Sequence, residues 1–381
     1  MLPKKLDNKL KKRKANNAFR QLGSESDLID FSSNDYLGFS TLEPIFDKAH
    51  QYILNHSLKL NGATGSRLLS GNHSLYSKVE NQIAQTHNSE AALIFNSGYD
   101  ANIGLLSSIP QRGDLILFDE LVHASIRDGI TMSNAKSYKY KHNDLEDLDK
   151  ILKRVQHKNE EIYIITESAF SMDGDSPDIQ KLVQLCKNNS AHLIIDEAHA
   201  IGVFNKGLVQ QLRLENDVFA RIITFGKALG CHGATILGSQ HLKDYLINFS
   251  RSFIYTTALP PHTLATIKTA YDELIIQGEC EESQMQKLKE NIAFFKSETS
   301  NLQLQELFIK SDSAIHCCIV PGNEEVKTLA QHLQNKGFDV KPILSPTVPV
   351  GKERLRFCLH SYNSKAEITN VLEHLAIFVK K

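Results

Sequence analysis

"RIITFGKALGCHGATILGS", residues 221–239, places one lysine between two short apolar runs rich in β-branched residues. Runs that are apolar at consecutive positions are typical of strands buried on both faces of a sheet. A lysine directly after such a strand is unusual, because an ammonium group is seldom buried without a partner. Lys227 is therefore the first candidate for chemistry, and we expect Gly226 and Gly230 to leave space around its amine.

The middle of the chain repeats this pattern of apolar runs. We expect strands at 91–96, 114–119, 161–166, 191–196, 221–225 and 234–239, with helical spacing between them at 145–156 and 177–189. Alternating strands and helices predict an α/β fold built on a mostly parallel sheet. Ligands in such sheets bind beyond the carboxyl ends of the strands.

The domain organisation changes after residue 260, where long helices are followed by a small α+β pattern that ends in "KAEITNVLEHLAIFV" (365–379). A chain of 381 residues is too long for one ordinary core, so we expect more than one domain. The predicted parts are an N-terminal arm with a short strand at 1–50, a large domain at 51–265, and a linking helix with a small C-terminal α+β domain at 266–381.

Composition excludes several classes of protein. The formal net charge is -1, so no global field indicates nucleic acid or an anionic membrane, and the basic run at 3–14 fits the wet face of a helix. The six cysteines form no C-x-x-C pair, which predicts neither a metal site nor a disulfide framework. No signal peptide and no membrane-spanning run is expected, and together these features favour a reducing, cytoplasmic location.

Reactive or small residues follow several of the predicted strands. Asp196 ends one strand and is followed by His199, while His123, Ser171 and Lys227 come shortly after three others. Because the carboxyl ends of parallel strands meet at one edge, residues far apart in the sequence are expected to line one cleft.

This set of residue types suits pyridoxal phosphate. A partly desolvated lysine can bond to a carbonyl carbon, and a carboxylate such as Asp196 can keep the cofactor's pyridine nitrogen protonated. A helix that begins in "NSGYDAN" (96–102) would present N–H groups to the phosphate, and Thr224 could add a hydroxyl. His123 could stack on the ring.

Simpler interpretations exist for each residue alone. Asp196 alone is more often a helix cap, and His123 or His199 alone is more often a core histidine with satisfied hydrogen bonds. The helicase-like "DEAH" (196–199) lacks the phosphate loop that a helicase needs. A non-catalytic scaffold protein of this fold would be expected to lose the lysine. The combination at the strand ends favours the catalytic interpretation.

Several long motifs resemble the α-oxoamine synthases. They are "GATGSRLLSGNHSLYSKVE" (62–80), "FNSGYDAN" (95–102), "ESAFSMDGD" (167–175), "IIDEAHAIGVFNKG" (194–207), "TFGKALGCHGA" (224–234) and "SPTVPVGKERLRFCL" (345–359). Members of this family are fold-type-I pyridoxal-phosphate enzymes, which condense an amino acid with an acyl thioester and lose carbon dioxide. The resemblance implies a seven-stranded, mostly parallel sheet in a large domain and a small C-terminal α+β domain.

The resemblance also implies roles for the residues at the strand ends. Lys227 would hold the cofactor covalently, and Asp196 would pair with its pyridine nitrogen. His123 would stack on its ring, and His199 would hydrogen-bond its phenolic oxygen. Further cofactor contacts would come from Gly98, Tyr99, Ser171 and Thr224.

For the substrates, the resemblance implies that Arg356 binds the amino-acid carboxylate and that His123, Arg20 and Thr347 contact substrate, whereas Arg354 is structural. The family's enzymes are homodimers with active sites at the interface. Asn34, and Thr256 or Thr257, would reach the site of the neighbouring subunit.

The N-terminal motifs "NNAFRQL" (16–22) and "LIDFSSNDYLGFS" (28–40) are most similar to the family member that joins L-alanine to a pimeloyl thioester in biotin biosynthesis. Sister enzymes that use glycine or serine share the cofactor motifs, so they remain an alternative. The acyl carrier would be coenzyme A or an acyl carrier protein.

Overall fold

The computed structural model describes residues 2–23, 27–155 and 161–379, which form two compact units. The larger unit comprises 34–171 and 176–287, and the smaller comprises 1–33, 172–175 and 288–381. The boundaries of these two units differ from the predicted domain boundaries. Residues 34–50 and 266–287 group with the larger unit, and the first 33 residues group with the C-terminal part.

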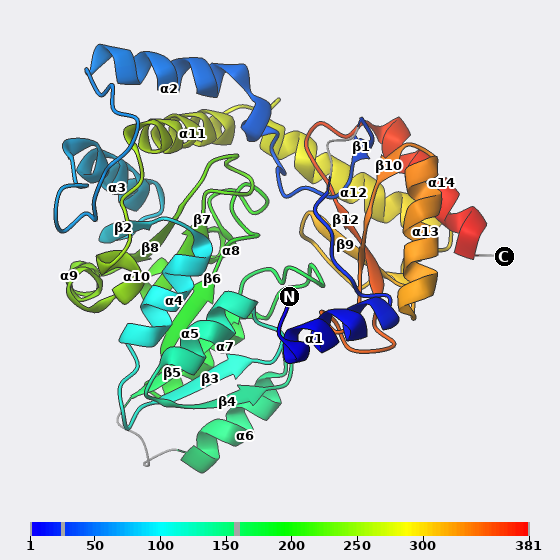
Figure 1. Ribbon diagram of the computed structural model, residues 1–381, viewed down its shortest axis with the longest axis horizontal. Helices are drawn as coiled ribbons and strands as arrows, with labels where there is room; N and C mark the ends of the chain where they lie inside the picture. The colour runs from blue at the N-terminus through cyan, green and yellow to red at the C-terminus, as the bar shows by residue number, and fades with distance from the viewer. Residues whose placement is uncertain (1, 24–26, 156–160, 380–381) are drawn as a thin grey trace. The chain divides into compact units, whose positions relative to one another are not determined.

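The larger unit contains a seven-stranded sheet with the order β2-β8-β7-β6-β5-β3-β4 (Figure 1). Only β8 runs antiparallel to its neighbours, so the predicted mostly parallel sheet is confirmed. Its strands are β2 (Ala91–Phe95), β3 (Leu115–Asp119), β4 (Lys136–Tyr140), β5 (Ile162–Glu167), β6 (His192–Asp196), β7 (Ala220–Thr224) and β8 (Ala234–Gly238).

Strand β4 is the one strand of this sheet that the sequence interpretation did not place. Its sequence, "KSYKY", has no apolar run, and all but its last residue are exposed. It lies at the edge of the sheet, where lysines prevent pairing with other chains. An apolar pattern therefore could not reveal it.

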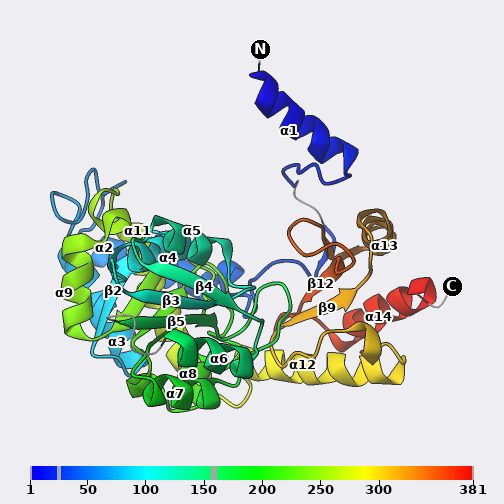
Figure 2. The ribbon, with the colours of Figure 1, turned by 90° about the horizontal axis from the view of Figure 1, so that it is seen from below.

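Both faces of the sheet are buried, and alternate residues of one strand serve opposite faces. Ile194 packs in one apolar cluster with helices α4 and α5, whereas Leu193 and Ile195 pack in another with α6 and α7. Figure 2 shows these two pairs of helices on opposite sides of the sheet. Each fully buried leucine or isoleucine contributes about 1.5–3 kcal/mol to stability, so the sheet is a rigid platform for its strand ends.

The helices of the larger unit follow the strands in the order that the sequence pattern predicts, with two long helices, α2 and α11, packed together outside the sheet. Their bounds are α2 (Glu43–Asn55), α3 (Ser74–Thr86), α4 (Gly98–Ser108), α5 (Ala124–Met132), α6 (Leu145–Val155), α7 (Ile179–Asn188), α8 (Leu208–Gln211), α9 (Gln240–Phe249), α10 (Arg251–Ile254) and α11 (Pro261–Glu279). Single 3-10 turns lie at Phe39–Thr41 and Glu215–Asp217.

The smaller unit contains an antiparallel sheet with the order β11-β12-β9, and a short parallel pair joins β1 near the N-terminus to β10. Its elements are α1 (Lys4–Ala15), β1 (Ile29–Asp30), most of α12 (Gln284–Asn301), a 3-10 turn at Gln305–Leu307, β9 (Ile315–Ile319), α13 (Asn323–Asn335), β10 (Phe338–Asp339), β11 (Lys341–Ile343), β12 (Arg354–Cys358) and α14 (Lys365–Val379). The predicted small α+β unit is therefore present.

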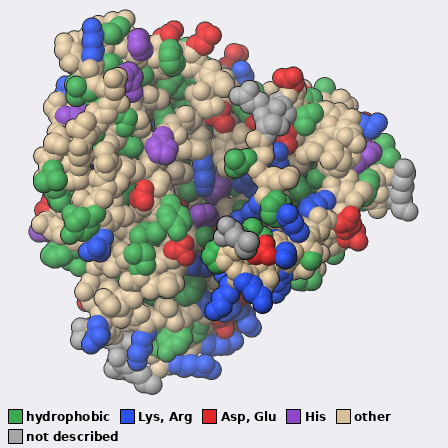
Figure 3. Space-filling view, viewed as in Figure 1, with side chains coloured by type: hydrophobic (Ala, Val, Ile, Leu, Met, Phe, Trp, Pro, Cys, Tyr) green, Lys and Arg blue, Asp and Glu red, His purple; other side chains and the backbone are tan. Residues whose placement is uncertain are grey.

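Helix α1 carries the basic run, and none of its residues is buried. Figure 3 shows lysine and arginine side chains gathered over this helix. Among the described residues, no helix combines the length and apolarity that a membrane span requires.

Candidate functional site

Lys227 lies in a tight loop immediately beyond the carboxyl end of β7. The loop is closed by the N–H of Gly230, which donates to the carbonyl of Lys227 at 2.8 Å, and by the N–H of Cys231, which donates to the carbonyl of Phe225 at 2.8 Å. Gly230 has a φ of 61°, and a Cβ there would lie 2.2 Å from the backbone nitrogen of Ser40. This glycine is therefore required by a close approach of two backbones, whereas the expectation was that it makes room for the lysine.

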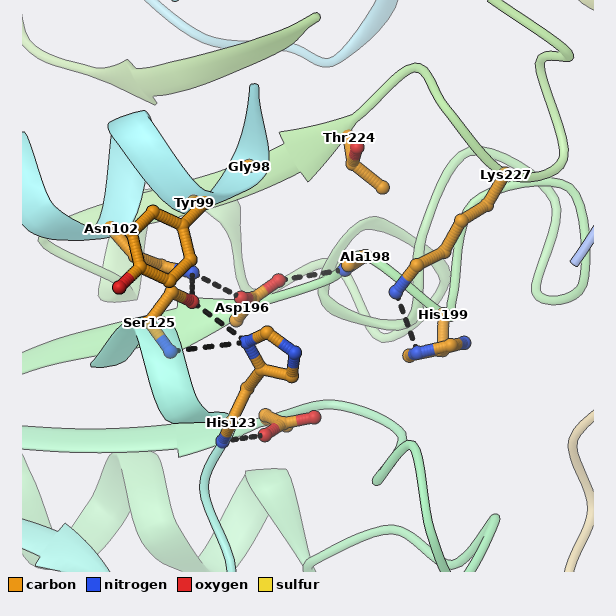
Figure 4. Close-up of a pocket in the computed structure, with 11 residues that line it drawn as sticks. Gly98, Tyr99, Asn102, His123, Ser125, Asp196, Ala198, His199, Thr224 and Lys227 are labelled. Atoms are coloured by element: carbon orange, nitrogen blue, oxygen red, sulfur yellow. Dashed lines mark hydrogen bonds between the residues drawn. The ribbon is translucent and has the colours of Figure 1, made fainter. Parts of the chain in front are cut away.

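A cavity of about 530 Å³ opens at this edge of the sheet (Figure 4). It gathers residues from the ends of β5, β6 and β7, from the loops that follow β3, β6 and β7, and from the N-terminal parts of α4 and α5. The lining residues are Gly98, Tyr99, Asn102, His123, Ser125, Glu167, Asp196, Ala198, His199, Thr224 and Lys227.

Asp196, at the end of β6, is held on both carboxylate oxygens. The N–H of Ala198 donates to Oδ1 at 2.9 Å, and Nδ2 of Asn102 donates to Oδ2 at 2.8 Å. The residue is only 6% exposed. A carboxylate oxygen has more than one lone pair, so a second donor from a ligand can still be accepted in the cavity.

Lys227 and His199 form a close pair on the opposite side of the cavity from Asn102 (Figure 4). Nζ of Lys227 lies 2.5 Å from Nε2 of His199. Nδ1 of His199 lies 2.7 Å from the hydroxyl of Tyr36, which itself donates to Oδ1 of Asn34 at 3.1 Å. If the tyrosine proton goes to Asn34, His199 carries its proton on Nδ1 and turns a lone pair toward the lysine.

This chain of contacts also places Asn34 within the same subunit. It lies behind Tyr36 and is linked through it to His199. The sequence interpretation expected Asn34 to act across a subunit interface, and that expectation stays a prediction.

His123 immediately precedes α5, and its ring borders the cavity. Its Nδ1 lies 2.8 Å from Oγ of Ser125 and accepts the N–H of Ser125 at 3.2 Å. Its own N–H donates to Oε1 of Glu167 at 2.6 Å. Burial lowers the pKa of His123, and Lys227 lowers it further, whereas Asp196 has the opposite effect.

Glu167 is buried at the end of β5, where it pairs in register with Asp196 of β6. Burial raises its pKa to about 8, and the charge of Asp196 adds to this effect while Lys227 opposes it. Two carboxyl groups thus occupy adjacent strand ends in one apolar setting. The environment favours the protonated form of Glu167 near neutral pH.

The first turn of α4 supplies a candidate anion site. Ser97 caps this helix by accepting the N–H of Asp100 at 3.1 Å. The N–H groups of Gly98 and Tyr99 belong to the first turn, where a helix has no carbonyl partners for them. A Cβ on Gly98 would lie 3.6 Å from Oγ1 of Thr224, so the hydroxyl borders the same space. Tyr99 directs its hydroxyl to Asp128 at 2.5 Å.

Ser171 is the predicted cofactor contact that is absent from the described residues lining this cavity. It follows Phe170, which is buried beneath the sheet edge. Its role stays a prediction. Thr256 and Thr257 lie near the start of α4, where Nδ2 of Asn96 donates to Oγ1 of Thr256 at 2.9 Å and to the carbonyl of Thr257 at 2.8 Å.

The predicted substrate contacts in the smaller unit fall into two places. Arg20 donates to Oγ1 of Thr347 at 3.3 Å, and both line a separate cavity of about 570 Å³. Arg356 lies on β12 and is 8% exposed. Arg354 is buried and donates to the carbonyl of Met172 at 2.9 Å and to Asp173, which fits the structural role expected of it.

Sequence reasoning missed four residues of the site. Glu167 could have been found, since it is the last residue of a strand that was predicted. Asn102 and Tyr36 lie within quoted motifs, but no motif shows that their side chains take part in the site. Ser125 follows His123 on α5, and the packing of α4 on α5 brings it beside Asn102.

The residues of the cavity at the sheet edge fit pyridoxal phosphate. Lys227 offers an amine in the cavity, Asp196 a held carboxylate, and His123 an imidazole face. The N-terminus of α4 with Thr224 offers donors for a phosphate at the opposite end from His199. One cavity therefore supplies a covalent anchor, a partner for a pyridine nitrogen and an anion cradle.

Comparisons with known proteins agree with this reading. Residues 26–375 match the family model described as aminotransferase class I and II. An 8-amino-7-oxononanoate synthase of Emericella nidulans is 41% identical over 380 residues, covering 93% of this chain and 90% of the relative. The chain therefore belongs to the aminotransferase class I and II family, in its α-oxoamine synthase group. It is a pyridoxal-phosphate-dependent C-acyltransferase, which confirms the predicted family and cofactor.

Solved structures agree on the fold. An 8-amino-7-oxononanoate synthase from Francisella tularensis is 28% identical with a TM-score of 0.78, covering 93% of this chain and 99% of that one. A serine palmitoyltransferase from Sphingomonas wittichii is 26% identical with a TM-score of 0.86, covering 100% and 98%. The predicted fold-type-I architecture is thereby confirmed.

Proposed function

We propose that this enzyme condenses L-alanine with a pimeloyl thioester and releases 8-amino-7-oxononanoate, carbon dioxide and a free thiol. The observation that carries the proposal is the 41% identity, over 93% of the chain, to a relative that bears the name of this synthase. Overall, a bond forms between the α-carbon of alanine and the thioester carbonyl. The carbon–sulfur bond breaks, the amino-acid carboxylate leaves as carbon dioxide, and a proton returns to the α-carbon.

In this proposal the cavity at the sheet edge would hold the cofactor through its own residues. Lys227 would hold the cofactor covalently, Asp196 would accept the pyridinium N–H, and His199 would hydrogen-bond the phenolic oxygen. His123 would cover the ring face, and the first turn of α4 together with Thr224 would hold the phosphate. When bound, pyridoxal phosphate supplies an electron sink that stabilises negative charge on the α-carbon of the amino acid.

The protein groups then manage protons and position. The amine of Lys227 would take the α-proton of the amino acid and later return it. His199, with Nε2 at 2.5 Å from Nζ, can hold a proton for the lysine at that stage. Arg356 is proposed to bind the amino-acid carboxylate with its planar fork, and Arg20 and Thr347 are proposed to contact the acyl substrate.

The proposal also covers the oligomeric state, the acyl carrier and the cellular compartment. We place the enzyme as a homodimer with interface active sites, to which Asn34 and Thr256 or Thr257 contribute. The thioester is carried by coenzyme A or an acyl carrier protein, and the product belongs to biotin biosynthesis. No disulfide links the six cysteines, all of which the structure describes, and this supports a reducing compartment such as the cytoplasm.

The decisive experiment is the product mass from purified holoenzyme, L-alanine and pimeloyl-CoA. We expect the mass of 8-amino-7-oxononanoate, together with one free thiol and one carbon dioxide per product. The same assay with a pimeloyl-loaded carrier protein in place of pimeloyl-CoA should give the same product. The acyl donor with the higher kcat/KM is then the preferred one. Absence of this product with both donors would refute the substrate assignment.

A second candidate is a sister synthase that uses serine or glycine. It is favoured by the TM-score of 0.86 to a serine palmitoyltransferase, against 0.78 to the Francisella tularensis synthase. Titration of the holoenzyme with alanine, glycine and serine separates the two by the change in visible absorption. The strongest change with alanine is expected, and the strongest change with serine or glycine supports the sister enzyme.

A further inference from the structure

Two buried residues of the cavity, Asn102 on α4 and Ser125 on α5, connect the carboxylate of Asp196 to the ring of His123. Asn102 is 2% exposed and Ser125 is 1% exposed, although both border the cavity. Helices α4 and α5 pack directly against one another, which brings these side chains together. Figure 4 shows the hydrogen bonds running from Asp196 through Asn102 and Ser125 to His123.

The orientation of the Asn102 amide follows from its neighbours. Its Nδ2 lies 2.8 Å from Oδ2 of Asp196 and 3.0 Å from Oγ of Ser125. An ionised carboxylate only accepts hydrogen bonds, so the amide must turn its NH₂ group, and not its carbonyl, toward Asp196. The two amide protons then go one to Asp196 and one to Ser125.

The proton of the Ser125 hydroxyl is directed by this arrangement. Because Oγ accepts a proton from Asn102, its own proton is free to donate to Nδ1 of His123, 2.8 Å away. The backbone N–H of Ser125 donates to the same Nδ1 at 3.2 Å. Nδ1 therefore faces two hydrogen-bond donors, and a proton on Nδ1 would be repelled by the protons of both.

A neutral imidazole carries one proton, so two donors at Nδ1 leave that proton on Nε2. In Figure 4 the second ring nitrogen of His123 lies on the side of the ring that faces Lys227 and His199. The N–H of Nε2 is thus directed into the cavity, where a ligand oxygen could accept it.

We propose that Asn102 and Ser125 are positioning residues that fix His123 as the neutral tautomer with its proton on Nε2. The Asp196 carboxylate fixes the orientation of the Asn102 amide. The amide in turn directs the Ser125 hydroxyl toward the His123 ring, which is proposed to lie over the cofactor. The inference rests on the proposed placement of the cofactor in this cavity. It gives a role to Asn102, the last residue of "FNSGYDAN" (95–102), and to Ser125, and the sequence analysis assigned a role to neither.

Charged groups around the His123 ring have opposite effects on its protonation. The carboxylates of Asp196 and Asp128 favour the imidazolium, and Lys227 and Arg127 disfavour it. The carboxyl of Glu167, whose environment favours the protonated form, accepts the backbone N–H of His123. Because these charges stay in place when Ser125 changes, its hydroxyl can be tested separately.

The test is nitrogen NMR of the holoenzyme labelled in its histidine rings, with His123 assigned by His123→Gln. The expected wild-type pattern is a protonated Nε2 and an unprotonated Nδ1 at neutral pH. In Ser125→Ala one donor to Nδ1 is lost. We expect the midpoint of His123 titration to rise by roughly 0.5–1 pH unit, since one hydrogen bond is worth about 1 kcal/mol. Ser125→Thr, which keeps the hydroxyl, restores the midpoint.

The matched control is Ser108→Ala on α4. Ser108 is also buried, but its hydroxyl donates to the carbonyl of Gly104 at 2.6 Å and not to the cavity. It should leave the His123 titration unchanged. A protonated Nδ1 in the wild type overturns the proposal, and so does an equal titration in Ser125→Ala and Ser108→Ala.

Two features keep this test decisive. If Ser125→Ala fails to fold, the wild-type nitrogen pattern alone still decides the tautomer. If the enzyme makes no product from alanine and a pimeloyl thioester, the tautomer can be read all the same. Failure of the proposed function and failure of this inference are therefore distinguishable.

Discussion

Nζ of Lys227 lies 2.5 Å from Nε2 of His199, although 28 positions separate the two residues in the chain. Strand β6 positions the histidine and strand β7 positions the lysine, and the two strands are neighbours in the sheet. Because a lysine amine acts as a nucleophile or base only without its extra proton, an imidazole lone pair at this distance is well placed to take that proton.

Replacing Lys227 by alanine removes the proposed anchor and proton carrier. We expect the visible absorption of the holoenzyme to change and kcat to fall by at least about 10²–10⁴-fold, the usual contribution of a positioned acid or base. Borohydride reduction followed by peptide mass spectrometry should fix the cofactor to the Lys227 peptide in the wild type only. A labelled peptide from another lysine would contradict the assignment.

Tyr36→Phe removes the hydroxyl that lies 2.7 Å from Nδ1 of His199. Loss of one buried hydrogen bond is worth about 1–1.5 kcal/mol, so we expect kcat to fall about tenfold while KM changes less. Steady-state kinetics with both substrates measures this. The control is Tyr245→Phe, whose hydroxyl bonds the carbonyl of Ser108 at 2.9 Å outside the cavity. Equal kcat in Tyr36→Phe and the wild type would rule out the orienting role.

Asp196→Asn keeps the shape of the side chain but removes its charge. The variant should bind pyridoxal phosphate at least about tenfold more weakly and lose about 10²-fold or more in kcat, because the pyridine nitrogen loses its ionic partner. Fluorescence titration of the cofactor-free protein measures the affinity. Asp114→Asn is a suitable control, since Asp114 is equally buried but precedes β3 at the other end of the sheet. Unchanged cofactor affinity in Asp196→Asn would argue against the pairing.

Glu167→Gln tests the raised pKa of this carboxyl, which is about 8 in the folded protein against 4.5 for an ordinary glutamate. Between these values the folded state keeps a proton that the unfolded state has lost, so stability falls as pH rises through this window. The slope is at most about 1.4 kcal/mol per pH unit. Glutamine cannot ionise, so the melting temperature of the variant should decline less between pH 5 and pH 8.

The exposed Glu90 provides the comparison for this measurement. Glu90→Gln should reproduce the wild-type dependence of melting temperature on pH. If Glu167→Gln does the same, Glu167 is ionised in the folded enzyme and the interpretation fails.

Gly230→Ala tests the contact between the Lys227 loop and the segment at 39–40. With a φ of 61° and a Cβ 2.2 Å from the nitrogen of Ser40, alanine should cost about 1–3 kcal/mol or more. The melting temperature should fall by several degrees. Gly226→Ala is the matched control, because a Cβ there would lie 3.5 Å from the carbonyl of Cys231, an ordinary contact. Equal melting temperatures of the two variants would contradict the close approach.

Local pattern was enough to predict most of the sheet. Runs such as "AHLIID" are apolar at consecutive positions because both faces of the strand are covered, and this is visible without the fold. Strand β4 was not predicted, because an edge strand needs no apolar face. Asp196, His199 and Lys227 were predictable because parallel strands bring their carboxyl ends to one edge.

Residue type and spacing along the chain were enough to predict the fold class, the family and the residues that gather at the edge of the sheet. How those residues are held depends on contacts between distant segments. Asn102, Ser125 and Tyr36 are ordinary polar residues in the sequence, and they enter the site because helix and loop packing turns them toward it. The direction of a hydrogen bond depends on atoms from distant segments meeting within about 3 Å, and no local pattern encodes that meeting.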